Sequence, residues 1–350
     1  MTHDAVRIAG WPAWARPLVP LLGALCLAVL GAQTAFAAGT PLRQIADSHG
    51  LKIGTALAAN HLSADAMYAN IANAQFNSVT PENEMKWGVV EPNRGQFNWS
   101  GADQIVNFAQ SHGQRIRGHN LVWHSQLPGW VNSLPLSQVQ GVMQQHIATE
   151  VGRYRGRLAV WDVVNEPFNE DGSFRSDVFT RAMGTGYIAT ALRAARTADP
   201  SAKLFLNDFN IEAVNAKSNA MFNEIRLLKS QGVPIDGVGF ESHFVLGQIP
   251  SSLQQNMARF AGLGITVEIT ELDVRMQLPT SSAKLTQQAN DYATVVRACR
   301  AVSGCRAITV WEYTDKYSWV PGTFSGQGAA DIYDQNLQPK PAYTSVQQTL

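Results

Sequence analysis

Two glutamates occupy positions where a carboxylic acid and a carboxylate could act together. One residue separates Glu166 from the end of the apolar run 158–164, and Glu271 directly follows the apolar run 265–270. The alternative is that each Glu only forms a structural salt bridge at the end of a strand. Few Lys or Arg residues lie near either Glu in sequence, which argues against this alternative. Glycoside hydrolysis needs one carboxylic acid to protonate the leaving oxygen and one carboxylate to attack or to activate water. The sequence therefore predicts a catalytic pair, whose separation decides between retention and inversion.

Other polar and aromatic side chains follow apolar runs in the same way. Aromatic faces pack against the apolar faces of sugar rings, while amides and carboxylates form hydrogen bonds with hydroxyl groups. A phosphate-binding site would contain more Arg, Lys and Gly than these segments do. The segments therefore predict a sugar-binding site. The segments begin at Pro81, Gly118, Asn165, Asn207, Glu241, Glu271 and Trp311.

The elements that must position these residues are short strands alternating with helices. Such an alternation over most of the chain predicts one α/β domain, a single (β/α)8 TIM barrel, with its active site at the carboxyl ends of the strands. An open doubly wound sheet is the alternative, but the sequence shows no strand–glycine-loop–helix fingerprint for a dinucleotide. The eight predicted strands cover residues 51–57, 76–80, 115–122, 158–164, 203–206, 235–240, 265–270 and 307–310.

Helical stretches separate these runs, and some carry end signals. Ser137 followed by Gln140 matches a capping box, and Gly232 and Gly262 stand where a helix would need a left-handed stop. The series contains neither a linker nor a repeat, so no carbohydrate-binding module is expected. The predicted helices cover residues 63–73, 102–111, 137–154, 178–198, 217–231, 251–262 and 284–302.

Composition excludes several classes of protein. Of 350 residues, 45% are hydrophobic and 15% are charged, which is typical of a folded globular chain. Lys and Arg together number 27, as do Asp and Glu, so no basic excess favours nucleic acid or an anionic membrane. We therefore expect no nucleic-acid partner and a monomeric protein.

The amino terminus resembles an export signal. Arg7 and Arg16 precede an apolar stretch at 18–30, and Ala35-Phe36-Ala37 is a small-x-small cleavage pattern. A membrane anchor is the alternative, but 13 apolar residues are fewer than the roughly 20 that a spanning helix needs. The sequence predicts a cleaved signal peptide at 1–37, a catalytic domain at 38–350, and a secreted, extracellular protein without membrane attachment.

Export changes the interpretation of the cysteines. Cys299 and Cys305 are the two that remain after leader removal, and an oxidising compartment favours a disulfide between them. Two thiols without a nearby His supply too few ligands for a closed zinc site. We therefore expect a disulfide, no metal and no cofactor.

The sequence contains three distinctive motifs, Trp161-Asp-Val-Val-Asn-Glu-Pro167, Gly118-His-Asn-Leu-Val-Trp-His124 and Ile269-Thr-Glu-Leu-Asp273. Together they resemble glycoside hydrolase family 10, the endo-β-1,4-xylanases. The resemblance runs from about residue 51 to residue 343 and also takes in Thr80–Trp87 and Trp311–Trp319. It implies xylan and xylo-oligosaccharides as substrates and a retaining mechanism.

The resemblance also implies roles for individual residues. Glu166 would be the acid/base and Glu271 the nucleophile, with Asn165 donating to the sugar 2-hydroxyl and His243 bonded to the nucleophile. Trp311 and Trp319 would cover the sugar, and Trp311 would crowd the hydroxymethyl group of a hexose. The residues that would bind the non-reducing-side sugars are Glu82, Asn83, Lys86, His119 and Trp123.

Three positions depart from the family pattern. Glu241 stands where Gln is usual and alters the charge beside Glu271, while Phe209 lacks the hydroxyl of the Tyr that is common there. Glu312 replaces a usual Gly and is expected to narrow or recharge the cleft rim. These departures leave open a β-1,4-glucan or cellulose hydrolase of the same mechanism. A catalytically silent carbohydrate-binding barrel is the alternative from another class, although both carboxylates are present.

Overall fold

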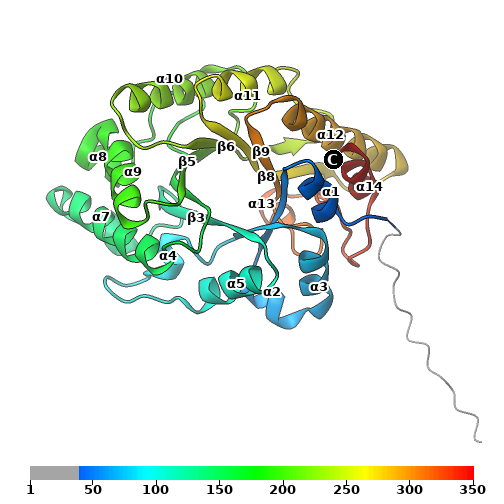
Figure 1. Ribbon diagram of the computed structural model, residues 1–350, viewed down its shortest axis with the longest axis horizontal. Helices are drawn as coiled ribbons and strands as arrows, with labels where there is room; N and C mark the ends of the chain where they lie inside the picture. The colour runs from blue at the N-terminus through cyan, green and yellow to red at the C-terminus, as the bar shows by residue number, and fades with distance from the viewer. Residues whose placement is uncertain (1–38) are drawn as a thin grey trace, which may run out of the picture. The chain divides into compact units, whose positions relative to one another are not determined.

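The computed structural model describes residues 39–350, which form one (β/α)8 barrel (Figure 1). Neighbouring strands pair in parallel in chain order, and β9 pairs with both β8 and β1, which closes the ring. The predicted fold is confirmed. The strands of the ring are β1 (Lys52–Leu57), β2 (Ser78–Pro81), β3 (Arg115–Trp123), β4 (Val160–Asn165), β5 (Lys203–Asp208), β6 (Gly237–Phe240), β8 (Thr266–Gln277) and β9 (Cys305–Val310).

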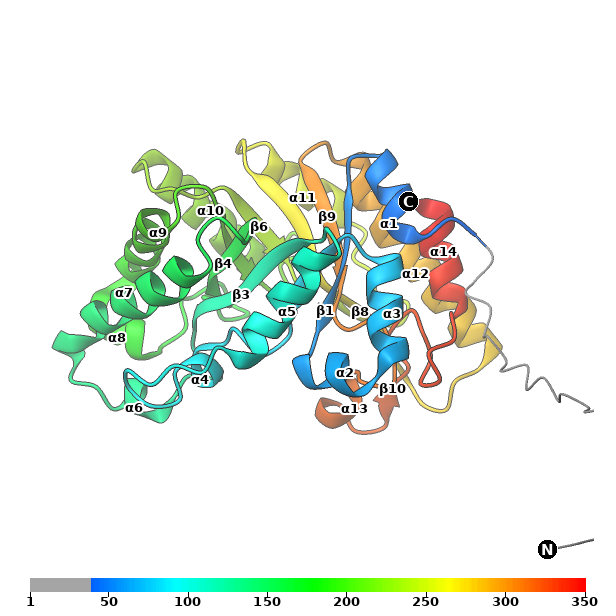
Figure 2. The same cartoon turned by 60° about the horizontal axis from the view of Figure 1, so that its bottom comes forward.

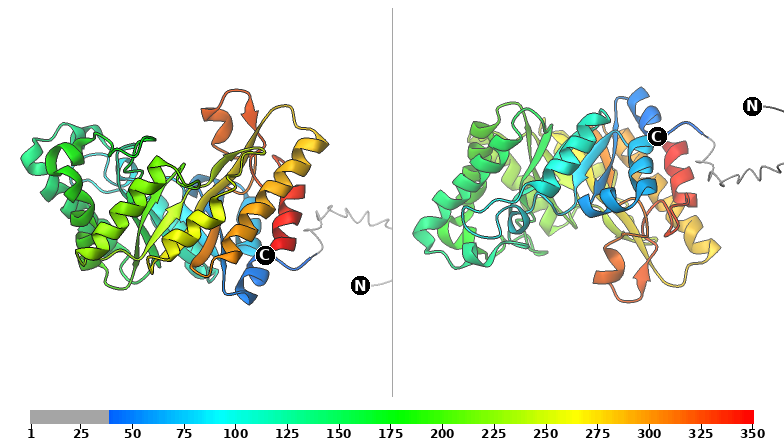
Figure 3. Two further views of the ribbon diagram at one scale, coloured as in Figure 1. Left: turned by 90° about the horizontal axis from the view of Figure 1, so that it is seen from above. Right: turned by 90° about the horizontal axis from the view of Figure 1, so that it is seen from below.

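Helices that follow the strands lie outside the ring, as Figures 1 and 3 show. Their inner faces are apolar, while the strands are buried along almost their whole length, as parallel strands covered by helices must be. These outer helices are α3 (Ala66–Gln75), α5 (Ser100–Ser111), α7 (Leu136–Arg153), α8 (Val178–Met183), α9 (Tyr187–Ala198), α10 (Ala216–Ser230), α11 (Leu253–Ala261), α12 (Ser282–Ala301) and α14 (Pro341–Thr349).

Short elements that follow the strands gather at one end of the barrel, the lower end in Figure 2. There β8 continues beyond the ring, where it pairs with β7 (His243–Val245) and, antiparallel, with β10 (Gln327–Gly328). This end carries the carboxyl ends of the strands, where barrel enzymes place their active sites. The short helices here are α2 (Ala59–Ala64), α4 (Trp87–Val90), α6 (Gly129–Asn132) and α13 (Val320–Thr323), and α1 (Leu42–Ser48) precedes β1.

Two glycines make room for side chains on neighbouring strands, Gly118 for Trp161 and Gly239 for Asn207. A Cβ on Gly118 would collide with the indole ring of Trp161 on the next strand. A Cβ on Gly239 would collide with the side-chain amide of Asn207 and would press against the methyl group of Thr270. Because core atoms are close-packed, neither side chain has room to withdraw. Gly239 therefore determines where Asn207 can lie.

Several helix ends differ from the predictions. Helix α7 begins one residue before Ser137, so that residue does not form the predicted capping box. Gly232 has the expected positive φ of 63°, but Gly262 remains right-handed and Gly264 makes the left-handed turn, with φ 73°. The single helix predicted at 178–198 is interrupted at Gly184, where φ is 60°. Local signals located these helices correctly but misplaced their ends.

The predicted disulfide is present between Cys299, near the end of α12, and Cys305, at the start of β9. None of the helices within residues 39–350 is long and apolar enough to cross a membrane. The predicted leader lies outside the described residues.

Replacing both cysteines by serine should lower the melting temperature modestly and leave turnover unchanged. The bond closes a loop with a sequence separation of 6, for which loop-closure entropy gives a stabilisation of about 2 to 3 kcal/mol. The bond lies away from the cavity described below, so catalysis should not respond. Thermal melts and steady-state rates of the double variant test this. Two free thiols titrated in the unfolded, unreduced wild type would contradict the pairing.

Candidate active site

A cavity of about 700 Å³ opens at the carboxyl ends of the strands. All of the residues predicted to act on or bind the sugar line it, although they come from the ends of β2, β3, β4, β6 and β8, from β7 and from the segment that follows β9. These residues are Glu82, Asn83, Lys86, His119, Trp123, Asn165, Glu166, Glu241, His243, Glu271, Trp311 and Trp319.

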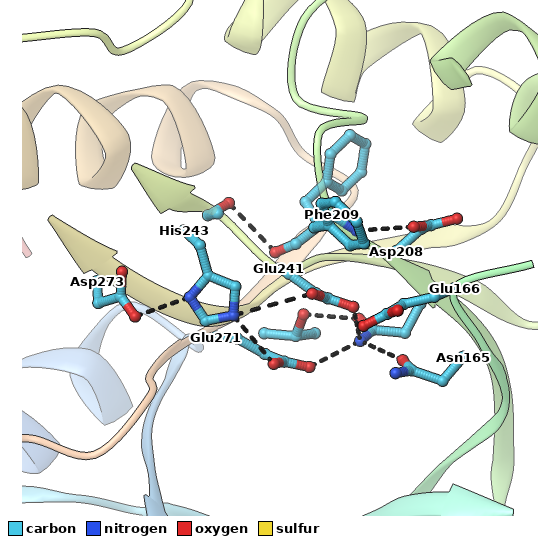
Figure 4. Close-up of polar contacts among 12 residues, drawn as sticks. Asn165, Glu166, Asp208, Phe209, Glu241, His243, Glu271 and Asp273 are labelled. Atoms are coloured by element: carbon cyan, nitrogen blue, oxygen red, sulfur yellow. Dashed lines mark hydrogen bonds and ion pairs between the residues drawn. The ribbon is translucent and has the colours of Figure 1, made fainter. Parts of the chain in front are cut away.

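Glu166 follows β4 in a left-handed backbone conformation, with φ 51°. Its backbone N–H donates to the carbonyl of Asn207 on the neighbouring strand at 2.8 Å. Arg175 donates from Nε to the backbone carbonyl of Glu166 at 2.9 Å. Such conformations are costly outside glycine and persist where surrounding contacts hold them, commonly at functional sites. The turn directs the Glu166 carboxyl into the cavity (Figure 4).

Glu271 lies on β8, and its backbone N–H donates to the carbonyl of Glu241 at 3.0 Å. Its two carboxylate oxygens have different partners. Asn207 Nδ2 donates to Oε1 at 2.8 Å, and His243 Nε2 lies 3.3 Å from Oε2. With 5% of its surface exposed, the carboxylate reaches the cavity but is held on both sides.

The surroundings of Glu166 and Glu271 move their pKa values in opposite directions. Burial raises the pKa of Glu166, and the negative charge of Glu271 raises it further. Burial would also raise the pKa of Glu271, but His119 and His243 outweigh it and hold this pKa below its usual value. One carboxyl is therefore suited to hold a proton while the other is ionised, as an acid and a nucleophile require.

His243 connects Glu271 to Asp273. Its Nδ1 lies 2.8 Å from Asp273 Oδ2, and the indole Nε1 of Trp319 donates to the same oxygen at 2.8 Å. Burial opposes protonation, but Asp273 and Glu271 raise the pKa of His243 to about 10. The imidazole is thus positively charged at neutral pH and stabilises the Glu271 carboxylate.

Glu241 completes this group of side chains. It accepts a hydrogen bond from Asn207 Nδ2 at 3.1 Å, and its other oxygen lies 3.8 Å from His243 Nε2. Burial and the charge of Glu271 raise the pKa of Glu241 well above its usual value. These surroundings favour the protonated form of Glu241, which can act as a hydrogen-bond donor, as Gln would.

The opposite wall presents cationic and aromatic groups. Lys86 Nζ donates to Asn83 Oδ1 at 2.9 Å and lies 5.1 Å from the ring centroid of Trp123. His119 Nδ1 lies 3.1 Å from buried Asp162, which orients the imidazole. The rings of His119 and Trp311 meet edge to face at 5.1 Å. This wall combines hydrogen-bonding groups with ring faces, which is suited to a sugar.

Two of the three departures have clear structural consequences. Phe209 lines the cavity, and Lys217 Nζ lies 3.4 Å from its ring centroid, so the ring is packed against a cation and offers no hydroxyl. Glu312 does not line the cavity: it is 0% exposed and accepts a hydrogen bond from the Tyr68 hydroxyl at 2.6 Å. The prediction that Glu312 alters the cleft rim is wrong, because its side chain turns into the protein interior.

Sequence reasoning did not assign a role to Asn207. Its side-chain Nδ2 contacts Asn165, Glu241 and Glu271, at 2.8, 3.1 and 2.8 Å. Its Oδ1 accepts from Thr270 Oγ1 at 2.7 Å. The signal available in the sequence was its position at the end of the fifth strand, which matches that of Asn165 on the fourth.

A sequence profile described as "Glycosyl hydrolase family 10" matches residues 41–349. The chain belongs to this family. An endo-1,4-beta-xylanase of Agaricus bisporus is 56% identical over 286 residues, covering 81% of this chain and 86% of the relative. An endo-1,4-beta-xylanase A of Phanerodontia chrysosporium is 51% identical over 300 residues, covering 85% of this chain and 73% of the relative.

Solved structures of family 10 enzymes have the same fold. Xylanase 10B from Thermotoga petrophila, in complex with xylobiose, superposes with a TM-score of 0.87 at 40% identity, covering 90% of this chain and 98% of that one. A glycosylated endo-beta-1,4-xylanase from Gloeophyllum trabeum gives 0.85 at 41% identity, covering 88% and 98%. This family 10 protein is therefore a glycoside hydrolase with a TIM barrel.

Proposed function

We propose that this protein is a secreted endo-1,4-β-xylanase that cleaves internal bonds of xylan with retention of configuration. The observation that carries the proposal is the pair Glu166 and Glu271, placed on separate strands of one cavity with pKa values moved apart. The names of relatives more than 50% identical support the xylan substrate. Xylobiose bound to a family neighbour supports a cavity that accepts xylo-oligosaccharides.

In the first step Glu166 donates its proton to the leaving oxygen while Glu271 attacks the anomeric carbon. The glycosyl-enzyme no longer carries the Glu271 charge, so the pKa of Glu166 falls and it becomes the base that activates water. His243, held by Asp273, stabilises the Glu271 carboxylate before attack and as it leaves. Asn165 donates to the sugar 2-hydroxyl, and Glu241 donates from its carboxylic acid where a Gln amide is usual.

Binding uses the remaining lining residues. We assign the non-reducing-side sugars to Glu82, Asn83, Lys86, His119 and Trp123, and the aromatic cover to Trp311 and Trp319. Crowding by Trp311 would disfavour a hydroxymethyl group, an effect worth about 1 to 3 kcal/mol, or roughly 10- to 200-fold.

The experiment that tests the function is product analysis on xylan and on mixed β-glucan. Wild type should release short xylo-oligosaccharides from xylan early in the reaction and should act on β-glucan at least about ten times more slowly. Glu271→Ala, purified in parallel, should release neither product and so excludes contaminating activities. Equal or faster glucan cleavage would favour a glucan hydrolase, and sugar binding without any cleavage would favour a silent binding barrel.

We also propose that residues 1–37 are removed on export and that the mature chain is an extracellular monomer. The disulfide of Cys299 with Cys305 supports an oxidising compartment. Mass spectrometry of the culture supernatant should find a chain beginning at Ala38, and light scattering should give the mass of a single chain. A chain that retains its leader in the membrane fraction would contradict the proposal.

Glu241→Gln should shift the alkaline limb of kcat/KM to higher pH. Since burial and the charge of Glu271 raise the pKa of Glu241, the group keeps its proton to higher pH than an ordinary Glu and becomes negative as pH rises through that pKa. Ionisation removes a donor and adds repulsion beside Glu271, whereas Gln remains neutral throughout. The measurement is a pair of pH–rate profiles recorded with a chelator present. Superimposable alkaline limbs would show that Glu241 does not limit activity at high pH.

A further inference from the structure

Three potential ligand atoms converge on one point at the cavity floor. Glu241 Oε2, His243 Nε2 and Glu271 Oε2 belong to side chains whose ligand atoms lie within 4.8 Å of one another. The imidazole nitrogen is 3.3 Å from the Glu271 oxygen and 3.8 Å from the Glu241 oxygen (Figure 4). Here a histidine stands between two carboxylates that come from adjacent strands of the barrel.

These spacings suit a tetrahedral ion. Zinc binds imidazole nitrogen and carboxylate oxygen at about 2.0 to 2.2 Å, which places neighbouring ligand atoms about 3.3 to 3.5 Å apart. The His243–Glu271 separation already has this value, and the His243–Glu241 separation exceeds it by less than about half an ångström. The Glu241 and Glu271 ligand atoms lie within 4.8 Å of each other, so side-chain rotations that bring these two carboxylates closer would complete the three protein ligands.

The other atom of each ligand group is already engaged. Asn207 Nδ2 donates to Oε1 of both Glu241 and Glu271, which leaves each Oε2 turned toward His243. His243 Nδ1 contacts Asp273 Oδ2, and Trp319 fixes that carboxylate in turn. A carboxylate on the far nitrogen of a metal-binding histidine is the usual outer partner in zinc sites, where it fixes ring orientation and tautomer.

Charge and access also fit a divalent cation. Once Glu241 and His243 have lost their protons to the solvent, the two carboxylates and the imidazole carry a charge of about −2, which one divalent ion neutralises. All three residues line the 700 Å³ cavity, so water can occupy the fourth coordination position. Glu241 is the distinctive component, because the Gln usual at this position would offer an amide, a weaker ligand than a carboxylate.

We propose that Glu241, His243 and Glu271 form an inhibitory site for a divalent transition-metal ion, with zinc as the probe. The ion binds the Glu271 oxygen and so engages an electron pair of the carboxylate that attacks the sugar. It competes with protons for His243 and Glu241, so binding releases protons. The sequence led us to expect no metal, and this proposed site differs from that expectation. Its inhibitory effect rests on the proposed role of Glu271, whereas ion binding does not.

The test is calorimetric titration of zinc into untagged, chelator-stripped protein. Wild type should bind one ion at this site, and Glu241→Gln, which replaces a ligand, should weaken that binding by at least about the tenfold seen when the supporting groups of metal ligands are changed. Asp273→Asn, which alters the partner of His243 and leaves the three ligands in place, should also weaken it. His49→Gln removes an exposed imidazole and is the matched control, with the affinity of wild type.

Cobalt gives a second readout that is independent of activity, because a tetrahedral site with these ligands produces intense visible absorption. Wild type should show this spectrum and Glu241→Gln should lose most of it. Equal zinc affinity in wild type and Glu241→Gln, or no binding below about 1 mM, would overturn the proposal.

Inhibition of hydrolysis should follow the calorimetric binding curve and should be reversed by chelator. Zinc that binds in a Glu241-dependent manner without inhibiting would overturn the inhibitory role and would also contradict the assignment of Glu271 as nucleophile. If metal-free protein fails to cleave xylan, the proposed function fails, and calorimetry and cobalt absorption still decide whether the site exists.

Discussion

Replacing Glu271 by glycine should reduce hydrolysis of xylan by about 10⁴-fold or more, the scale of loss when a catalytic nucleophile is removed. The other carboxyl groups of the cavity wall are poor substitutes, because Glu166 is needed as the acid and burial raises the pKa of both Glu241 and Glu82. The variant should regain turnover of an aryl β-xylobioside when azide is added, because the small anion fits the space that the side chain leaves. Attack from that space inverts the anomeric carbon and releases the phenol, so the product should be the α-xylobiosyl azide.

The matched control is Glu241→Gly, which opens a similar space beside the same His243. It should retain hydrolysis above the level of Glu271→Gly and should give no azide-dependent increase. A β-azide from Glu271→Gly would place the nucleophile elsewhere. An equal azide-dependent increase in the control would show that azide needs only the space left by a removed side chain, and not the loss of the nucleophile.

Glu166→Ala should separate substrates by the quality of their leaving group. Xylan and alkyl xylosides need a proton on the departing oxygen, so their cleavage should fall by about 10² to 10⁴-fold, the usual contribution of general acid catalysis. Aryl xylosides with strongly acidic phenols leave without help, so the glycosyl-enzyme should still form and should accumulate, because no base activates water. A burst of phenol release followed by slow turnover is the expected signature.

Azide should react with that accumulated intermediate and give the β-xylosyl azide, since two inversions restore the original configuration. Glu170→Ala, which removes an exposed carboxylate four residues away, is the control and should behave as wild type toward both substrate classes. Equal losses on activated and unactivated substrates would contradict the assignment of Glu166 as the acid. The two azide products, α from one variant and β from the other, distinguish the two carboxylates by stereochemistry alone.

The strands and the site could be predicted from sequence because the same local rule produces both. A parallel strand buried on two faces must be an apolar run, and the polar residue that ends it must lie at the mouth of the barrel. Glu166 and Glu271 each follow such a run, and the structure places both at the cavity. The order of runs along the chain then determines which residues lie near one another.

The features that sequence reasoning missed depend on contacts between distant segments. The extension of β8 to Gln277 exists because β7 and β10 supply hydrogen-bond partners there, and neither is a long apolar run. The inward turn of Glu312 depends on Tyr68, which lies 244 positions away in the chain. Asn207 was overlooked because its importance comes from partners on other strands rather than from its own neighbours.

The close contact of Gly239 with Asn207 affects how this enzyme can be diversified. Position 239 is absent from the cavity wall, so a mutagenesis library guided by substrate contacts would leave it out, while a random library would include it. Any side chain there displaces the amide that contacts both Glu241 and Glu271. In a deep mutational scan, position 239 should therefore tolerate substitution as poorly as the catalytic pair, whereas Phe209 and Phe324 on the wall should accept many residues. New sugar preferences can thus evolve through substitutions on the cavity wall, but not through substitutions at the residues packed directly beneath the catalytic side chains.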